Sequence, residues 1–161
     1  MSTLIEARSR MKPDQCQLIA IVFSVMYLEA FICNCAAVNL GNRKAKEFLK
    51  DKKTFLQKWE TIPKKTSGKE IKSDSPAMRS LRKLIKCRNS FIHFKSQDFP
   101  RSTSYLKEIE NNSQRQIADE AKNARNAISL LINELYNIHP NDITVYVAKK
   151  RIDERKSLYL E

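Results

Sequence analysis

One short string, RNSFIH at 88–93, contains the residue types needed for acid–base chemistry on a phosphate. An unperturbed histidine such as His93 titrates near a pKa of about 6.5, so it can take or give a proton at neutral pH. The guanidinium of Arg88 provides fixed donors for phosphate oxygens. RNA can be cut without a metal when its 2′-hydroxyl attacks the neighbouring phosphate, which requires a base, an acid and a cation. We therefore take Arg88, Asn89 and His93 as the candidate catalytic residues.

Each residue near this string also has a simpler interpretation. A lone histidine is more often a capping or surface residue, and Asn89 alone would be an ordinary amide on a helix surface. Lys86 and Lys95 are candidates for substrate binding, although solvated lysines would attract RNA without a specific contact. Glu29, the one charge between residues 15 and 42, is either a support that orients Arg88 or a polar partner within the core.

The string lies in a segment with helical periodicity, which we expect to form a helix over 76–94 after Ser75. Arg88 falls on the apolar face of that helix, three residues after Ile85 and four before Ile92. An unpaired guanidinium in a core is very costly. Arg88 must therefore be paired, open to a cleft, or placed at a subunit interface. A basic stripe follows the other side of the helix: Arg79, Arg82, Lys83, Lys86, Asn89, Ser90 and His93.

The rest of the chain is predicted to be helical almost throughout, with too few glycines for an all-β fold. Asp14 can cap a first helix that ends at Gly41 and Asn42. His139 is expected to cap a helix end before Pro140. The expected helices cover 15–38, 44–60, 76–94 and 117–138, the expected loops cover 61–76 and 95–113 with a short helix at 105–109, and the tail 141–161 is left open between strand and helix. These elements predict an all-α antiparallel four-helix bundle, a single domain over 1–161 with its core at about 14–138.

Residues 15–42 are apolar enough to cross a bilayer. Glu29 near the middle of that segment would cost about 2.5–3.5 kcal/mol in a membrane, so a buried central helix is the preferred interpretation. The four cysteines form no CxxC pair, and we expect small buried residues in a reducing cytoplasm, with no metal site and no cofactor. The polar first 17 residues do not resemble a signal peptide.

The charge of the chain is unevenly distributed. The formal net charge is +12, and residues 41–100 contain 17 Lys and Arg but only six Asp and Glu, so this stretch holds eleven of the twelve excess charges. Charge concentrated in this way indicates a polyanionic partner rather than a uniformly solvated surface. RNA is the leading candidate, because the excess flanks the Arg88–His93 string.

The string resembles the R-x4-6-H motif of HEPN domains, in its frequent RN-x3-H form. The upstream string YLEAFICNCAA also resembles the glutamate-bearing core helix of that family, and the order of helices over 14–138 is similar. Many HEPN domains are ribonucleases, including toxins of toxin–antitoxin and antiphage systems. Members often have a small residue after the histidine, whereas Phe94, Lys95 and Ser96 follow it here.

The resemblance implies a metal-independent ribonuclease, a toxin or defence effector with a cognate antitoxin. It also implies a homodimer in which two Arg88–His93 pairs meet in one composite site. Two other functions stay open. One is a non-catalytic HEPN-like module that binds nucleic acid or protein through the basic 41–100 stretch. The other is a membrane-associated protein that uses residues 15–38.

Overall fold

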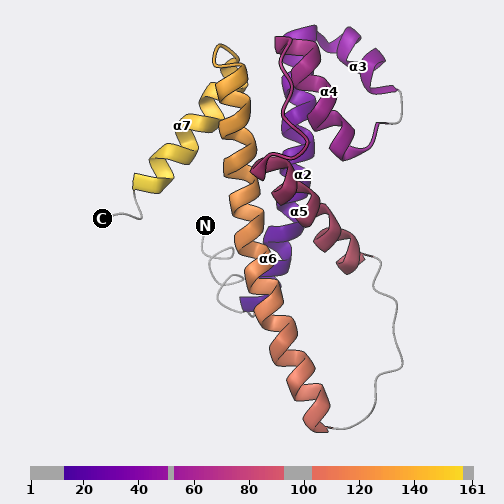
Figure 1. Ribbon diagram of the computed structural model, residues 1–161, viewed down its shortest axis with the longest axis vertical. Coiled ribbons are helices and arrows are strands. Elements are labelled where there is room, and N and C mark those ends of the chain that lie inside the picture. The colour runs from indigo at the N-terminus through magenta and orange to yellow at the C-terminus, as the bar shows by residue number, and fades with distance from the viewer. Residues whose placement is uncertain (1–12, 51–52, 93–102, 158–161) are drawn as a thin grey trace, which may run out of the picture.

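The computed structural model describes residues 13–50, 53–92 and 103–157, and this part of the chain contains six helices and no strand (Figure 1). The all-α prediction is therefore confirmed. The predicted four-helix bundle is not confirmed, because two of the expected segments divide or extend in ways the sequence pattern did not indicate.

The first described helix, α2 (Pro13–Leu40), confirms the helix expected over 15–38 and is slightly longer. It ends at Gly41, whose φ of 78° lies in the left-handed region that glycine adopts without steric cost. Asn42 is the first residue of the next helix, α3 (Asn42–Lys50). One face of α2, with Ile21, Leu28 and Ile32, is fully buried.

The helix expected over 44–60 is wrong, because α3 ends at Lys50 and a separate helix, α4 (Phe55–Ser67), begins after Thr54. Thr54 and Gln57 form a reciprocal cap: the Thr54 hydroxyl accepts from the Gln57 amide at 3.3 Å, and the Gln57 side chain accepts from the Thr54 amide at 2.9 Å. This cap starts a new helix inside the segment 44–60. Apolar residues at helical spacing lie on both sides of the break, at 48–49 and at 55–59, so periodicity alone predicts one helix.

The loop expected over 61–76 is also too long, because α4 continues to Ser67 and includes Pro63. Pro63 and Ile62 are buried, so packing offsets the cost of a proline inside a helix. The hydroxyls of Thr61 and Ser67 donate to carbonyls four residues earlier. Gly68, with φ 75°, ends the helix by donating its amide to the Lys64 carbonyl.

Helix α5 (Pro76–Ile92) agrees with the helix expected over 76–94 as far as the described residues extend. Its start is capped as predicted: the Ser75 hydroxyl oxygen accepts from the Met78 amide at 3.2 Å. The same hydroxyl lies 3.1 Å from a carboxylate oxygen of Glu134 and donates to it. This hydrogen bond attaches the N-terminus of α5 to Glu134 in the helix Thr103–Ile138. It therefore holds in place the end of α5 at which the basic stripe starts.

Helix α6 (Thr103–Ile138) contains the helix expected over 117–138 and begins fourteen residues earlier. Of the loop expected over 95–113, residues 95–102 lie outside the described part and the rest is helical. The short helix expected at 105–109 is therefore part of the longer α6. Ser and Asn residues in this stretch predict a loop, but their helix propensity is only moderately below that of other residues, so a helix can include them. Buried positions in the second half of α6, Ala124, Leu131 and Ile132, face the core.

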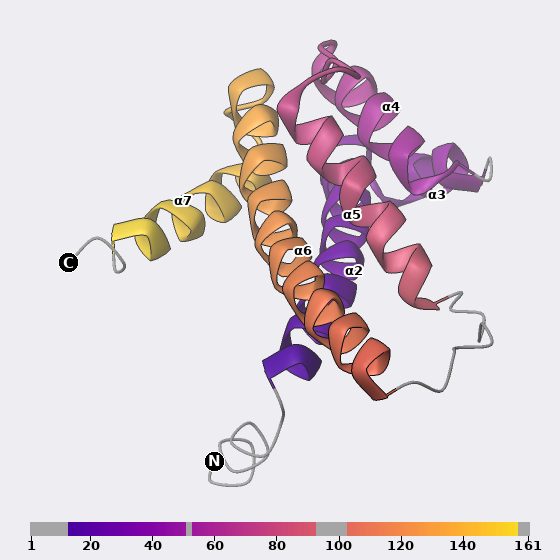
Figure 2. The same ribbon diagram turned by 60° about the horizontal axis from the view of Figure 1, so that its bottom comes forward.

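The two long helices α2 and α6 pack against each other and form the centre of the molecule (Figures 1 and 2). Helix α5 packs mainly on α6, while α3 and α4 pack on α2. Figure 2 shows α3, α4 and α5 together on one side of this central pair, with the last helix, α7 (Ile143–Ser157), on the other side. One hydrophobic cluster includes buried residues from all six helices, among them Ala45, Trp59, Leu81, Leu131 and Val145.

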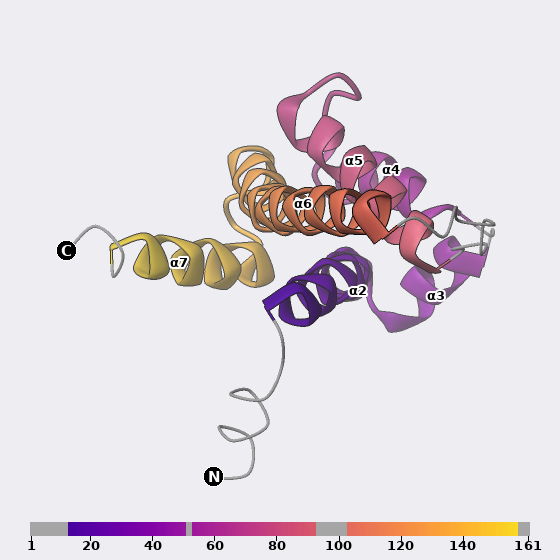
Figure 3. The same cartoon turned by 90° about the horizontal axis from the view of Figure 1, so that it is seen from below.

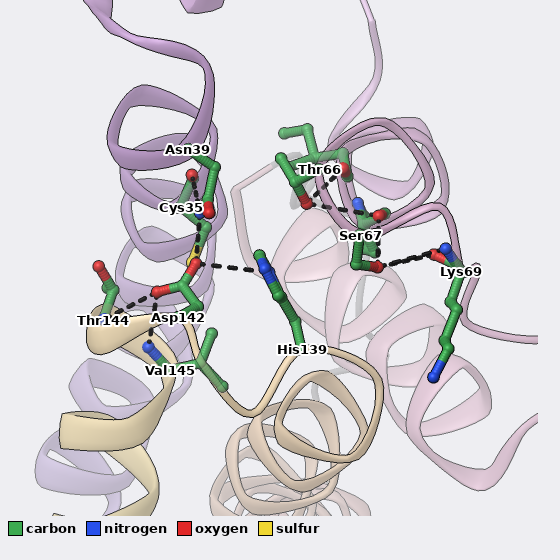
Figure 4. A network of polar contacts seen from close by, with 11 residues as sticks. Cys35, Asn39, Thr66, Ser67, Lys69, His139, Asp142, Thr144 and Val145 are labelled. Carbon is green, nitrogen blue, oxygen red and sulfur yellow. Dashed lines mark hydrogen bonds and ion pairs between the residues drawn. The ribbon is translucent and has the colours of Figure 1, made fainter.

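The tail, left open between strand and helix, is helical because Asp142 caps α7 (Figure 4). One carboxylate oxygen of Asp142 accepts from the amides of Thr144 at 2.7 Å and Val145 at 3.1 Å. The other accepts from the side-chain amide of Asn39 in α2, and Nδ1 of His139 lies 3.8 Å away. Asp142 is almost fully buried, so one side chain starts α7 and attaches it to α2.

Replacing Asp142 with alanine is expected to destabilise the protein by about 2 kcal/mol, because the cap of α7 is lost and the Asn39 side-chain amide keeps only the Cys35 carbonyl as an acceptor. Thermal unfolding followed by circular dichroism measures this. The matched control is Asp153→Ala, which removes an exposed carboxylate paired with Lys149 in the same helix and should cost about 0.5 kcal/mol or less. Equal losses in the two variants would contradict the role given to Asp142.

Candidate functional site

The candidate site is built on the C-terminal half of α5, whose inner face is apolar. Ala77, Met78, Leu81 and Leu84 on this face are fully buried. Arg88 follows Leu84 by one helical turn, so it continues the same face, as the sequence pattern predicts. The buried start of α5 thus directs the Arg88 side chain toward the interior side of the helix rather than toward the basic stripe.

Arg88 is half-buried at the end of this face, and no described residue forms a side-chain hydrogen bond or ion pair with its guanidinium. Of the three environments that the sequence allows for Arg88, pairing within the described part of the chain is therefore not found. An opening to solvent and an interface with another molecule are the other two environments that the sequence allows. Either of them would make the guanidinium available to a phosphate.

Asn89 lies on a different side of α5 and lines a shallow hollow of about 380 Å³. The hollow is formed by Arg82, Ile85, Lys86 and Asn89 of α5 together with residues 54–56 at the start of α4. The structure therefore brings Lys86 and Asn89 together, as the site requires, but Arg88 does not line this hollow. Sequence reasoning did not include two parts of this hollow among the site residues, namely Arg82 and the start of α4. The T-x-x-Q pattern at 54–57 is a helix-capping pattern and could have predicted where α4 starts.

The hollow has a positive electrostatic character. Arg82 and Lys86 are exposed, and neither has an ion-pair partner among the residues that the structure describes. The N-terminus of α4 adds the positive end of a helix dipole. Two cationic side chains, an amide and a helix start suit an anionic group such as a phosphate.

The surrounding helices extend this basic surface. Figure 2 shows α3, α4 and α5 on the same side of the molecule, so the basic residues of this part of the sequence lie on helices that share one side. We call this the basic surface; its exposed members on the three helices are Arg43, Lys44, Lys46, Lys50, Lys64, Lys65, Arg79, Arg82, Lys83 and Lys86. Several have acidic neighbours, such as Glu70 at 3.0 Å from Lys64 and Glu120 at 3.3 Å from Lys83.

Glu29 pairs with Lys58 of α4, because a carboxylate oxygen lies 2.6 Å from the Lys58 ammonium. The hydrogen bond to Glu29 raises the pKa of Lys58, and partial burial opposes this shift only in part. The structure thus places Glu29 at the contact between α2 and α4. The side chain of Glu29 is 41% exposed, so the pair lies at the edge of this contact, with Lys58 rather than Arg88 opposite Glu29.

Two predicted site residues, His93 and Lys95, lie outside the described residues. The second histidine, His139, lies at the end of α6 as expected, where its amide donates to the Leu135 carbonyl at 2.8 Å. Its side chain faces Asp142 at the start of α7 rather than α5 (Figure 4). His93 is therefore the one histidine that can belong to a site on α5.

The cysteines are free thiols, and Cys35 is buried as expected, whereas Cys16, Cys33 and Cys87 are half-buried. Burial raises the pKa of the Cys35 thiol to about 12, with a contribution from the charge of Asp142. Burial likewise raises the pKa of Cys87 to about 11. These thiols stay protonated at neutral pH and are poor nucleophiles. Among the described residues no group of three or more Cys, His, Asp or Glu is placed to hold a metal ion.

No family model, curated protein or solved structure matches this chain. The described part of the chain combines an all-helical fold, a half-buried Arg88 and a basic hollow on another side of α5.

Proposed function

We propose that this chain is a metal-independent ribonuclease of the HEPN type, a toxin or defence effector that cleaves cellular RNA. The observation that carries the proposal is Arg88, a half-buried cation on the apolar face of α5 without a partner in the described residues. Its position five residues before His93 matches the RN-x3-H form of the family motif. A cation at such a place is stabilised by solvent or by a counter-charge, and the phosphate of RNA would supply the latter.

In the proposed reaction, the 2′-oxygen of RNA attacks the adjacent phosphorus, and the bond from phosphorus to the 5′-oxygen breaks. The 2′-hydroxyl loses its proton to a neutral histidine, and the departing 5′-oxygen takes a proton from a protonated one. Arg88 stabilises the charge that develops on the phosphate oxygens. The products are a 2′,3′-cyclic phosphate and a free 5′-hydroxyl, so atoms and charge balance without an additional reactant.

One chain provides a single suitable histidine, so we propose that two chains form the site together. In a homodimer with a composite site, the two copies of His93 act as base and acid. Lys86, Lys95 and Asn89 would then hold the flanking RNA. The direct test is incubation of RNA with the protein in EDTA, followed by analysis of the ends produced. Cyclic phosphate and 5′-hydroxyl ends would support the proposal, and intact RNA would contradict it.

The second candidate is a non-catalytic module that binds RNA or an acidic partner. The hollow lined by Arg82, Lys86 and Asn89 favours it, because this positive site does not include Arg88. This candidate predicts RNA binding that weakens with salt, without cleavage. The membrane-associated alternative rests on residues Cys16–Leu40, which are long and apolar enough to span a bilayer by length and composition.

The double variant Arg82→Ala/Lys86→Ala is expected to weaken RNA binding about tenfold at moderate salt and to lower the slope of log affinity against log salt by about 1 to 2. Fluorescence anisotropy with a labelled single-stranded RNA measures both quantities. The matched control is Lys122→Ala/Arg125→Ala, which removes two exposed charges from α6, outside the basic surface. Equal weakening by the two variants would mean that net charge alone attracts RNA.

A further inference from the structure

A groove of about 650 Å³ lies between α7 and the two long helices, on the opposite side of that central pair from the hollow on α5. Three helices line it: Tyr27 and Phe31 come from α2, Ile128 comes from α6, and the other lining residues come from one face of α7. Figure 3 shows α7 extending away from α2 and α6. The groove thus follows the line along which α7 separates from the core.

Most of the groove is apolar. Phe31 and Ala148 are buried at its floor, whereas Ile143 is 62% exposed and Val147 is 39% exposed. Its volume falls within the range of about 300–1,000 Å³ that is usual for small-molecule sites, which are mostly apolar with a few polar groups. A hydrocarbon chain that covers these exposed side chains would remove apolar surface from water and so bind favourably.

One end of the groove is cationic. The lining residues of α7 are, in chain order, Ile143, Thr144, Val147, Ala148, Arg151, Ile152 and Arg155. Arg151 and Arg155 are exposed, and neither has an ion-pair partner among the described residues. Lys149 and Lys150, by contrast, each pair with an acidic side chain four residues later. The two guanidiniums in the groove are therefore available to an anionic group.

Tyr27 adds a hydroxyl group at the same end. Burial raises the pKa of Tyr27, whereas the nearby charges of Arg151 and Arg155 act in the opposite direction. The neutral phenol donates one hydrogen bond, and each guanidinium donates several in a fixed, planar geometry. A carboxylate has two oxygens that accept several such bonds, so its chemistry matches this set of donors.

We infer that this groove is a binding site for a long-chain fatty acid. Arg151 and Arg155 hold the carboxylate with Tyr27 as a third donor, and the hydrocarbon chain follows the apolar part of the groove toward Ile143. Residues 143 and 155 are twelve positions apart on α7, or about 18 Å along the helix axis. This distance is close to the extended length of palmitate.

The order of apolar and charged groups favours a free fatty acid over a membrane surface or an acidic protein helix. A surface that lies on an anionic membrane has basic side chains along its polar face, whereas both arginines of this groove belong to one end. An acidic helix would carry charged or polar side chains along its whole length, but the rest of the groove offers them no cation. A single anionic head on an uncharged chain has its parts in the same order as the groove.

The test measures binding of palmitate to the full chain, without RNA, by isothermal titration calorimetry below the concentration at which palmitate aggregates. One palmitate should bind per chain. Hexadecylamine has a chain of the same length and the opposite charge, and it should bind at least about tenfold more weakly. Each methylene added between laurate and palmitate should tighten binding about two- to fourfold.

The double variant Arg151→Ala/Arg155→Ala should weaken palmitate binding about 30-fold and leave hexadecylamine binding within about threefold. Both side chains are exposed, so the circular dichroism spectrum should stay that of the wild type. The matched control is Lys44→Ala/Lys46→Ala, which removes two exposed charges from α3, away from the groove. It should leave palmitate binding within about twofold.

Absence of palmitate binding to the wild type would overturn the inference, as would equal binding of palmitate and hexadecylamine or equal weakening by the two double variants. Wild type that binds no palmitate but sediments with vesicles containing phosphatidylserine would show that a lipid surface is the occupant. Wild type that instead binds a glutamate-rich amphipathic peptide would show that it is a protein helix. None of these measurements involves RNA, so they stand or fall separately from the proposed ribonuclease.

Discussion

Replacing His93 with alanine is expected to reduce RNA cleavage in EDTA by about 100-fold or more without unfolding the protein. A positioned acid or base contributes about 10²–10⁴-fold to the rate, and His93 is the one histidine available to a site on α5. Arg88→Ala should lower the rate by a similar amount, because it removes the cation that stabilises charge on the phosphate. Arg88→Lys should restore little, since an ammonium cannot reproduce the paired donors of a guanidinium.

Each variant has a matched control within the chain. His139→Ala removes the second histidine, which faces Asp142 at the other end of α6, and it should cleave RNA at the wild-type rate below its melting temperature. Arg79→Ala removes an exposed arginine of α5 whose side chain donates to the Asp74 carbonyl. It should cost at most a few-fold. Cleavage that persists in His93→Ala would reject this histidine as the proton carrier, and unchanged cleavage in Arg88→Ala would reject the proposed charge stabilisation.

Replacing Trp59 with alanine is expected to have the largest effect on stability, a loss of about 3–5 kcal/mol. Trp59 is fully buried where α4 meets α2, and its ring stacks on Phe31 with 6.5 Å between centroids. Alanine would leave a large cavity at the contact that holds α4, and hence the hollow beside α5, against the core. The melting temperature should fall by roughly 10 °C or more, measured by circular dichroism.

Trp59→Phe is the informative comparison. The indole N–H of Trp59 is buried and has no hydrogen-bond partner among the described residues. Phenylalanine keeps an aromatic ring against Phe31 and removes this unsatisfied donor, so the loss should stay below about 1.5 kcal/mol. If the two variants lost equal stability, the indole N–H rather than the volume of the ring would be the important feature, and the packing argument would be wrong.

The local sequence pattern predicted helix ends and buried faces correctly where the residues that determine them are close in the sequence. Gly41 ends α2 because its left-handed φ is strained for other residues, and Ser75 before Pro76 starts α5 through its own hydroxyl. In the second half of α6, Ala121, Ala124, Leu131 and Leu135 recur at helical spacing, and all four are buried. In each case the signal lies within one or two turns of the feature that it predicts.

The pattern failed where tertiary contacts override local preference. Pro63 and its polar neighbours indicated a loop, but packing extends α4 to Ser67. The polar start of α6 predicts a loop as well, although residues from 103 onward are helical; here the moderate helix propensity of Ser and Asn did not prevent a helix. The tail was undecided because ITVYV suits a strand or a helix, and Asp142 decided it by capping α7 and bonding to Asn39, 103 residues earlier.

For the candidate site, the sequence by itself determined that Arg88 lies on the apolar face of α5 and that positive charge gathers in residues 41–100. Both follow from spacing and composition, which need no knowledge of neighbours. Only the tertiary structure decided which groups meet: Glu29 with Lys58, Asn89 with the start of α4, and α3, α4 and α5 on one side. It also decided that α2 is buried on one side only. Periodicity describes the faces of a helix, whereas the partner of each face depends on chain segments far away in the sequence.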